Sequence, residues 1–338
     1  MLSLGRRNLV LGAVALALWG QSSIASDEAQ QQDRTGFIAG KAGAYNLRTS
    51  AEAEAMAQLG LMIVLYNPAA LTAPMRLAIE KAGVKYIDYF PQQIMYDRCS
   101  PSLHAVGVCP LDEKQRVVNE IKAHLAKYGQ DPNLVGYWVL DDYPGGDVRD
   151  LLKQIHAAIM DSNASLHDQR PAICGFGAQF GYSGGPHWGE PAPNEHVFPQ
   201  GAINFDADAC DMIGIYAYGV GAVQNARLID WSMKQLLPRM LTILRQHGWD
   251  PARSPLIGMP QTFAYTDPEY PTPWVLPRSQ DVTAQTWAYC RAGAVAILAY
   301  SWDDGFKGAK VELYNSKALQ NGLNDGVTKC RALWRRNN

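Results

Sequence analysis

Residues 61–91 read LMIVLYNPAALTAPMRLAIEKAGVKYIDYFP, and this stretch decides the fold. It holds two apolar runs, Leu61–Asn67 and Val84–Pro91, with an amphipathic segment between them. Thr72 can cap the start of that segment, and Gly83 follows its last apolar residue, which is typical of a helix. A strand, a helix and a second strand in this order predict a βα unit with parallel strands.

The same alternation continues along the chain. One-sided apolar periodicity after Asp112 and after Asp147 predicts further helices between the runs. The apolar runs are Phe37–Asn46, Leu61–Asn67, Val84–Pro91, Val135–Asp142, Ala172–Phe180, Met212–Gly219, Leu256–Phe263 and Val295–Asp303. Eight βα units predict an α/β fold of one domain, a (β/α)8 TIM barrel, whose usual size is about 250 residues.

Residues 181–209 have no helical period, so we interpret them as a long loop over the mouth of the barrel. A doubly wound open sheet is the alternative fold. No GxGxxG motif follows the first run, and dinucleotide binding in such a sheet is therefore not indicated. The sequence predicts no cofactor.

The composition excludes several classes of protein. The 338 residues are 47% hydrophobic and 18% charged, which is too apolar for a disordered chain. Lys and Arg number 30 against 32 Asp and Glu, so no excess of positive charge is present to neutralise phosphates. We therefore expect neither nucleic-acid binding nor electrostatic binding to a membrane surface.

Residues 1–25 are predicted to be a secretory signal peptide. Arg6 and Arg7 precede the apolar run Leu9–Trp19, and small residues end the segment at Ala25. Those eleven residues are fewer than the roughly 20 that span a bilayer. The paired arginines also suggest twin-arginine export. We expect a periplasmic or secreted protein with no membrane anchor after processing.

Cleavage would leave a flexible mature N-terminus, residues 26–35, before a barrel domain formed by residues 36–338. Export places six cysteines in an oxidising compartment, which favours disulfide bonds. Cys99 and Cys109 lie at the two ends of one loop and form the most credible pair, whereas the pairing of the other four stays open. No CxxC or HxxxH spacing occurs, so no metal site is predicted.

Carboxylates follow two of the predicted strands. The fourth run ends in Asp141-Asp142, and the eighth ends in Asp303. In a TIM barrel these ends form the active site, and a buried unpaired carboxylate costs several kcal/mol, so a purely structural role is disfavoured. Alternatively, the first pair could lie in a turn, with one of its acids capping the next helix. Because successive strand residues face opposite ways, we expect Asp142 to point over the barrel axis, supported by Asp141.

Aromatic and amide side chains accompany these acids at the strand ends. A planar ring stacks well on the C–H face of a sugar, although aromatic residues are also common in protein cores. The candidate substrate-binding residues are Trp138, Tyr216, Tyr218, Gln261, Trp302 and, in the long loop, Trp188.

At these strand ends the sequence resembles the TIM-barrel glycoside hydrolases, most of all the chitinase-like family 18. The fourth strand of that family ends in DxxDxDxE, often followed by Tyr-Pro, and Asp142-Tyr143-Pro144 would place Asp142 at the terminal acid. Here that acid is Asp rather than Glu, and Trp138 and Leu140 replace the other acids of the motif. The resemblance therefore implies a glycoside-hydrolase-like barrel without the chitinase mechanism.

The prediction that follows is an exported glycosidase acting on a poly- or oligosaccharide. Asp142 would be the general acid, and Asp303 the base or nucleophile. Strands four and eight lie on opposite sides of the barrel, and a wide carboxylate separation of ~6.5–9.5 Å would favour inversion. The alternative is a catalytically inactive barrel that binds a glycan, with its acids accepting hydrogen bonds from sugar hydroxyls.

Overall fold

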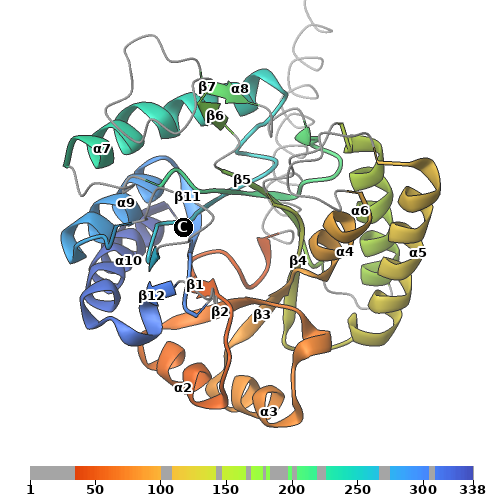
Figure 1. Cartoon of the computed structure of the whole chain (residues 1–338), viewed down its shortest axis with the longest axis horizontal. Coiled ribbons are helices and arrows are strands. Elements are labelled where there is room, and N and C mark those ends of the chain that lie inside the picture. Colours follow the sequence, from red (N-terminus) through yellow and green to blue (C-terminus); the bar gives the residue numbers. More distant parts are fainter. Residues whose placement is uncertain are drawn as a thin grey trace, which may run out of the picture.

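The computed structural model describes residues 35–99, 109–141, 147–164, 169–177, 180–182, 197–199, 204–218, 226–265, 275–303 and 309–337. Eight parallel strands close into a barrel in the order β1-β11-β9-β8-β5-β4-β3-β2 (Figure 1). These strands are β1 (Ala42–Tyr45), β2 (Leu61–Tyr66), β3 (Lys85–Asp88), β4 (Leu134–Asp141), β5 (Ala172–Phe176), β8 (Met212–Ile215), β9 (Leu256–Gly258) and β11 (Ala294–Ala299). Each predicted apolar run supplies one strand, and the predicted TIM barrel is confirmed.

Helices surround the barrel (Figure 1). They are α2 (Ser50–Gln58), α3 (Ala73–Ala82), α4 (Phe90–Cys99), α5 (Leu111–Tyr128), α6 (Arg149–Ala164), α7 (Ala226–Trp231), α8 (Leu237–Gln246), α9 (Ser279–Arg291) and α10 (Lys317–Asn337). The capping signals act as predicted at α3. Thr72 Oγ1 accepts a hydrogen bond from the Met75 amide at 3.4 Å, and Gly83 ends the helix with a φ of 68°.

Two small sheets of two strands each are separate from the barrel. In the segment that we expected to be a loop, β6 (Phe180–Tyr182) pairs antiparallel with β7 (Val197–Pro199). A second pair is formed by β10 (Ala264–Tyr265) and β12 (Ala309–Val311). Such short pairs carry too little periodicity to be recognised in the sequence. Trp188 and Asp142 lie outside the described residues, as do residues 1–34.

The core has an inner and an outer layer. Inside the barrel, Trp138 of β4 has no exposed surface and lies between two glycines of neighbouring strands. A Cβ atom on Gly214 would lie 2.4 Å from Trp138 Cη2, and one on Gly175 would lie 2.5 Å from Cζ2. Only glycine at both positions leaves room for the indole. The outer layer packs the other faces of the strands against the helices.

All six cysteines form disulfide bonds. The expected Cys99–Cys109 bond is present. The pairs that the sequence left open are Cys174–Cys210, which links β5 to the segment before β8, and Cys290–Cys330, which links α9 to α10. None of the helices in the described part of the chain is long and apolar enough to cross a membrane.

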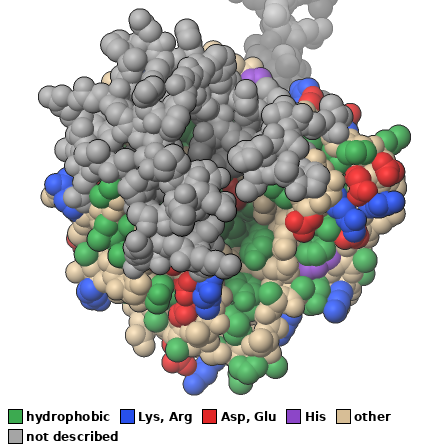
Figure 2. Space-filling view, viewed as in Figure 1, with side chains coloured by type: hydrophobic (Ala, Val, Ile, Leu, Met, Phe, Trp, Pro, Cys, Tyr) green, Lys and Arg blue, Asp and Glu red, His purple; other side chains and the backbone are tan. Residues whose placement is uncertain are grey.

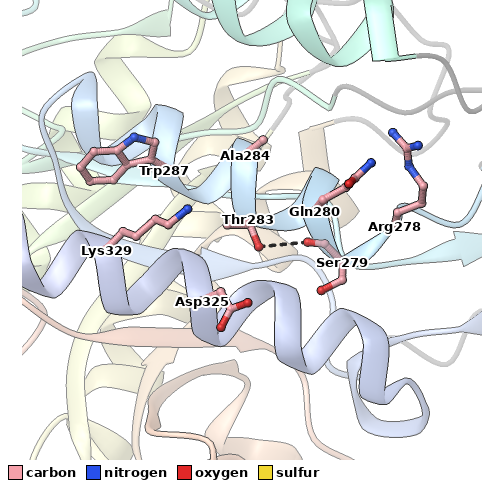
Figure 3. Close-up of a pocket in the computed structure, with 8 residues that line it drawn as sticks. All are labelled: Arg278, Ser279, Gln280, Thr283, Ala284, Trp287, Asp325 and Lys329. Carbon is pink, nitrogen blue, oxygen red and sulfur yellow. Dashed lines mark hydrogen bonds between the residues drawn. The ribbon is translucent and has the colours of Figure 1, made fainter.

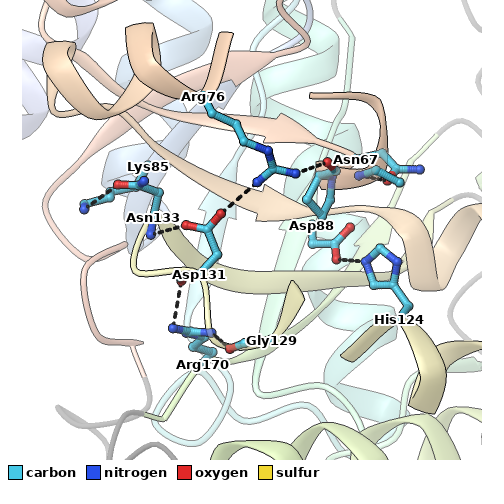
Figure 4. Close-up of polar contacts among 11 residues, drawn as sticks. Asn67, Arg76, Lys85, Asp88, His124, Gly129, Asp131, Asn133 and Arg170 are labelled. Atoms are coloured by element: carbon cyan, nitrogen blue, oxygen red, sulfur yellow. Dashed lines mark hydrogen bonds and ion pairs between the residues drawn. The ribbon is translucent and has the colours of Figure 1, made fainter. Parts of the chain in front are cut away.

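Two polar clusters, one buried and one partly buried, connect the outer layer to the barrel (Figure 4). Asp88, at the end of β3, lies 2.6 Å from Nε2 of His124 on α5, and both side chains are almost fully buried. Burial raises the pKa of Asp88, and the hydrogen bond with His124 opposes this shift. Asp131 accepts from Arg76 at 3.0 Å, while Arg170 donates to the Asp131 carbonyl at 3.0 Å. These contacts hold the turn before β4.

Candidate active site

A register shift in β4 places Asp141 on the inner side of the barrel. The pairing of β4 with β5 shifts between Trp138 and Leu140. Trp138 therefore packs in the inner layer, whereas Val139 and Leu140 both pack in the outer layer. The alternation of sides is reset, and Asp141 returns to the inner side.

The Asp141 side chain is half-buried and is surrounded by tyrosine hydroxyls. Tyr216, which follows β8, donates to Asp141 Oδ1, and the Tyr45 hydroxyl of β1 lies 3.5 Å from Oδ2. Tyr96 of α4 donates to the backbone carbonyl of the same residue. Hydrogen bonds donated to a carboxylate stabilise its charged form and fix its orientation. The side chain of Asp141 is therefore held in one orientation at the carboxyl end of β4.

Aromatic rings form a connected group beside this carboxylate. Tyr216 stacks on Tyr218 with ring centres 5.6 Å apart. Phe263 contacts both Tyr218 and Tyr300 edge-on, with centres 5.3 Å apart in each case. Tyr300 in turn lies 5.0 Å from Tyr45. Figure 2 shows hydrophobic side chains, which include tyrosine in its colouring, in a hollow near the middle of the face seen in Figure 1.

Glycine makes room for this aromatic group. A Cβ atom on Gly177, just after β5, would lie 1.8 Å from Cε2 of Tyr216. The Tyr216 ring therefore reaches Asp141 only because residue 177 has no side chain. The same strand carries Gly175, whose Cβ would lie 3.0 Å from Asp141 Oδ1. Glycines in and just after β5 thus open the space in which the tyrosine and the carboxylate meet.

The end of β11 carries the second predicted carboxylate. Asp303 Oδ1 lies 2.9 Å from Arg48 Nε, and its side chain is 12% exposed. Trp302 is buried, and its indole nitrogen donates to Glu52 of α2 at 3.2 Å. Ser301 donates to the buried carboxylate of Glu312. The Asp303 carboxylate is therefore paired with the guanidinium of Arg48.

The structure brings together only part of the predicted set. Asp141, Tyr216 and Tyr218 lie in one group at the mouth. Three of the predicted residues, Trp138, Gln261 and Trp302, are at most 1% exposed. Their side chains therefore support the mouth and present no free face to a sugar. Asp142 and Trp188 lie outside the described residues, and their roles stay predictions.

Three contributors to the site were missed in the sequence, namely Tyr45, Tyr96 and Arg48. Tyr45 is the next-to-last residue of the first apolar run, and the rule that strand ends form the site could have found it. Tyr96 comes from a helix, and no sequence signal links it to β4. In the described part of the chain, no cluster of three or more His, Cys, Asp or Glu side chains could hold a metal ion.

Comparisons with known proteins connect the chain to glycosidases through its fold alone. No protein-family model matches it, and no curated protein matches its sequence. Among solved structures, the β-galactosidase of the psychrophilic Marinomonas ef1 matches with a TM-score of 0.51 at 10% identity, over 88% of this chain and 60% of that one. Ruminococcus gnavus β-glucuronidase matches at 0.52 and 9% identity, over 89% and 51%. A class V chitinase of Pseudomonas fluorescens Pf-5 matches at 0.48 and 12% identity, over 85% and 99%.

The chain thus has the TIM-barrel fold found in glycoside hydrolases, as its resemblance implied. It spans only about half to 60% of the galactosidase and glucuronidase chains. At such low identity the likeness establishes the architecture, and the chemistry has to be argued from the residues at the mouth.

Proposed function

We propose that this protein is an exported glycoside hydrolase that acts on a poly- or oligosaccharide at the mouth of its barrel. One observation carries the proposal. Asp141 projects to the inner side at the end of β4, hydrogen-bonded by Tyr216 and Tyr45 and adjoining a group of aromatic rings. A fixed carboxylate beside aromatic surface suits a reaction in which positive charge develops on a sugar ring.

The acids divide the work according to their environments. Asp141, held in place by its phenol donors, suits the base or nucleophile. Asp142, the next residue, is retained as the proton donor proposed from the sequence. Asp303, neutralised by Arg48, suits an acceptor for substrate hydroxyls. In this division Asp141 is the base or nucleophile, the role that the sequence alone suggested for Asp303.

Export is supported by the disulfide bonds. Three disulfides in one chain of this size are typical of proteins that mature in an oxidising compartment. Sequencing the N-terminus of the exported protein tests the cleavage proposed after Ala25. A retained Met1 would count against it.

The test of activity is a screen of the purified protein against a polysaccharide panel, with release of reducing ends as the readout. Asp141→Asn and Asp142→Asn should each lower turnover by about 10²- to 10⁴-fold, the usual contribution of acid–base groups. Asp161→Asn is the matched control, because this exposed acid lies in the last turn of α6, at the end of the helix away from the mouth. Full activity of Asp141→Asn on a substrate that the wild type cleaves would refute the assignment.

The catalytically inactive glycan-binding barrel is the second candidate. The ion pair of Asp303 with Arg48 favours it, because it suits Asp303 to accept hydrogen bonds from sugar hydroxyls rather than to act as a second catalytic carboxylate. Binding of a polysaccharide without any release of reducing ends would select this function.

A further inference from the structure

An open groove of about 730 Å³ runs between α9 and α10 on the outside of the barrel (Figure 3). One wall consists of Ser279, Gln280, Thr283, Ala284 and Trp287 of α9, and Asp325 and Lys329 of α10 form the other. The distance along α9 from its first lining residue to Trp287 is about 12 Å, at roughly 1.5 Å per residue.

The topology places one end of this groove at the rim of the barrel mouth. In a βα barrel, each helix begins at the end where the preceding strand finishes. Helix α9 follows β9 and starts at Ser279, so Arg278 and Ser279 lie toward the end of the molecule that carries Asp141. The groove then leads away from the mouth toward Trp287.

The walls of the groove are held rigidly. A Cβ atom on Gly322 of α10 would lie 2.3 Å from the Ser279 carbonyl oxygen, so the two helices are in close backbone contact. Thr283 Oγ1 lies 2.9 Å from the Gly322 carbonyl. The Cys290–Cys330 bond fixes the helices again at the other end. A preformed groove loses little conformational entropy when it binds a ligand.

The chemistry of the walls fits a neutral, hydroxyl-rich ligand. Arg278 is paired with the buried Asp281 at 2.9 Å, and Asp325 and Lys329 carry opposite charges, so the groove has no net charge. Within the described part of the chain, the side chains of Asp325, Lys329 and Trp287 form no hydrogen bond or ion pair. An indole beside free donors and acceptors offers both stacking and hydrogen bonds.

We propose that this groove binds a segment of polysaccharide outside the active site, with a sugar ring on Trp287 and its hydroxyls bonded to Asp325 and Lys329. This inference rests on the proposed function, and it adds a second site that holds the polymer while its chain reaches the mouth. A neutral groove disfavours an anionic ligand, and its charged lining disfavours an apolar one.

Affinity electrophoresis tests the proposal, using native gels cast with soluble starch, galactomannan or glycol chitin. We expect retardation of the wild type in at least one gel, and about fivefold to tenfold weaker affinity for Trp287→Ala. Because Trp287 also packs against the core, Ala284→Gln is the second variant. Ala284 is exposed in the groove, so a longer side chain blocks it without removing a core contact. Ala318→Gln, at an exposed position of α10 outside the groove, is the matched control and should bind like the wild type.

The outcomes separate this proposal from the proposed function. If Ala284→Gln and Trp287→Ala are retarded as strongly as the wild type, the groove proposal is wrong, even if the protein hydrolyses a polysaccharide. So does the absence of retardation of the wild type in all three gels. Loss of retardation in the groove variants alone supports the groove, whether or not the wild type releases reducing ends. In an active enzyme, the same variants should keep wild-type turnover on a short oligosaccharide.

Discussion

Replacement of Gly214 by Ala tests the packing that supports the mouth of the barrel. The new Cβ would lie 2.4 Å from Trp138 Cη2 and 3.0 Å from the sulfur of Met259. A Cβ atom on Gly175 would lie 2.5 Å from the adjoining ring atom Cζ2, so two strands pack closely on the same part of the indole. Trp138 lies three residues before Asp141 on the same strand, so any displacement of the indole is passed to the end of β4.

Overpacking of this kind costs about 1–3 kcal/mol, and we expect the upper part of that range because the contact is with a rigid ring. Trp138→Phe alone should cost about 2 kcal/mol, since it leaves a partly empty space. In the double variant the new methyl group occupies some of that space. The double variant should therefore be destabilised by at least ~1 kcal/mol less than the sum of the two single variants.

Urea unfolding followed by circular dichroism measures each free energy of unfolding. Gly136→Ala is the control on β4, because its Cβ would come no closer than 3.2 Å to a neighbouring atom. It should cost less than about 1 kcal/mol. Additivity of Gly214→Ala and Trp138→Phe within ~0.5 kcal/mol would show that the two residues do not contact each other as described.

Three further predictions concern the buried polar groups and the disulfides. His124→Leu removes the partner of a fully buried carboxylate and should destabilise the fold by about 3 kcal/mol in urea at pH 7; His156→Leu, in a more exposed pair, should cost less. Because burial raises the pKa of Asp88, the folded state holds its proton at a pH where the unfolded state has lost it. Stability should therefore fall as pH rises above about 3.9, and Asp88→Asn should flatten that slope; an unchanged slope would exclude Asp88 as its source. Replacing Cys174 and Cys210 by Ala opens a loop of 36 residues and should cost about 4 kcal/mol, whereas a loss below ~1 kcal/mol would contradict the chain-entropy estimate.

The architecture could be predicted because its signals are local. Each strand of the barrel is a short apolar run, and each is separated from the next by helical periodicity or turn residues. Thr72 and Gly83 mark the ends of α3 through their own backbone preferences. The Cys99–Cys109 bond was accessible for the same reason, since the two residues are only ten apart. The pairings across 36 and 40 residues depend on how strands and helices meet.

The sequence by itself determined the barrel, the end of it at which chemistry is expected, and the presence of acids and aromatic residues there. Only the tertiary structure showed that Asp141 lies on the inner side of the barrel. The apolar run before Asp141 continues without interruption, so the register shift at Val139 leaves no mark in the pattern. The shift exists in the pairing of β4 with β5, and the hydroxyl that holds Asp141 comes from Tyr216, 75 residues away. Side-chain direction within a strand is local, but a bulge and its partners belong to the sheet.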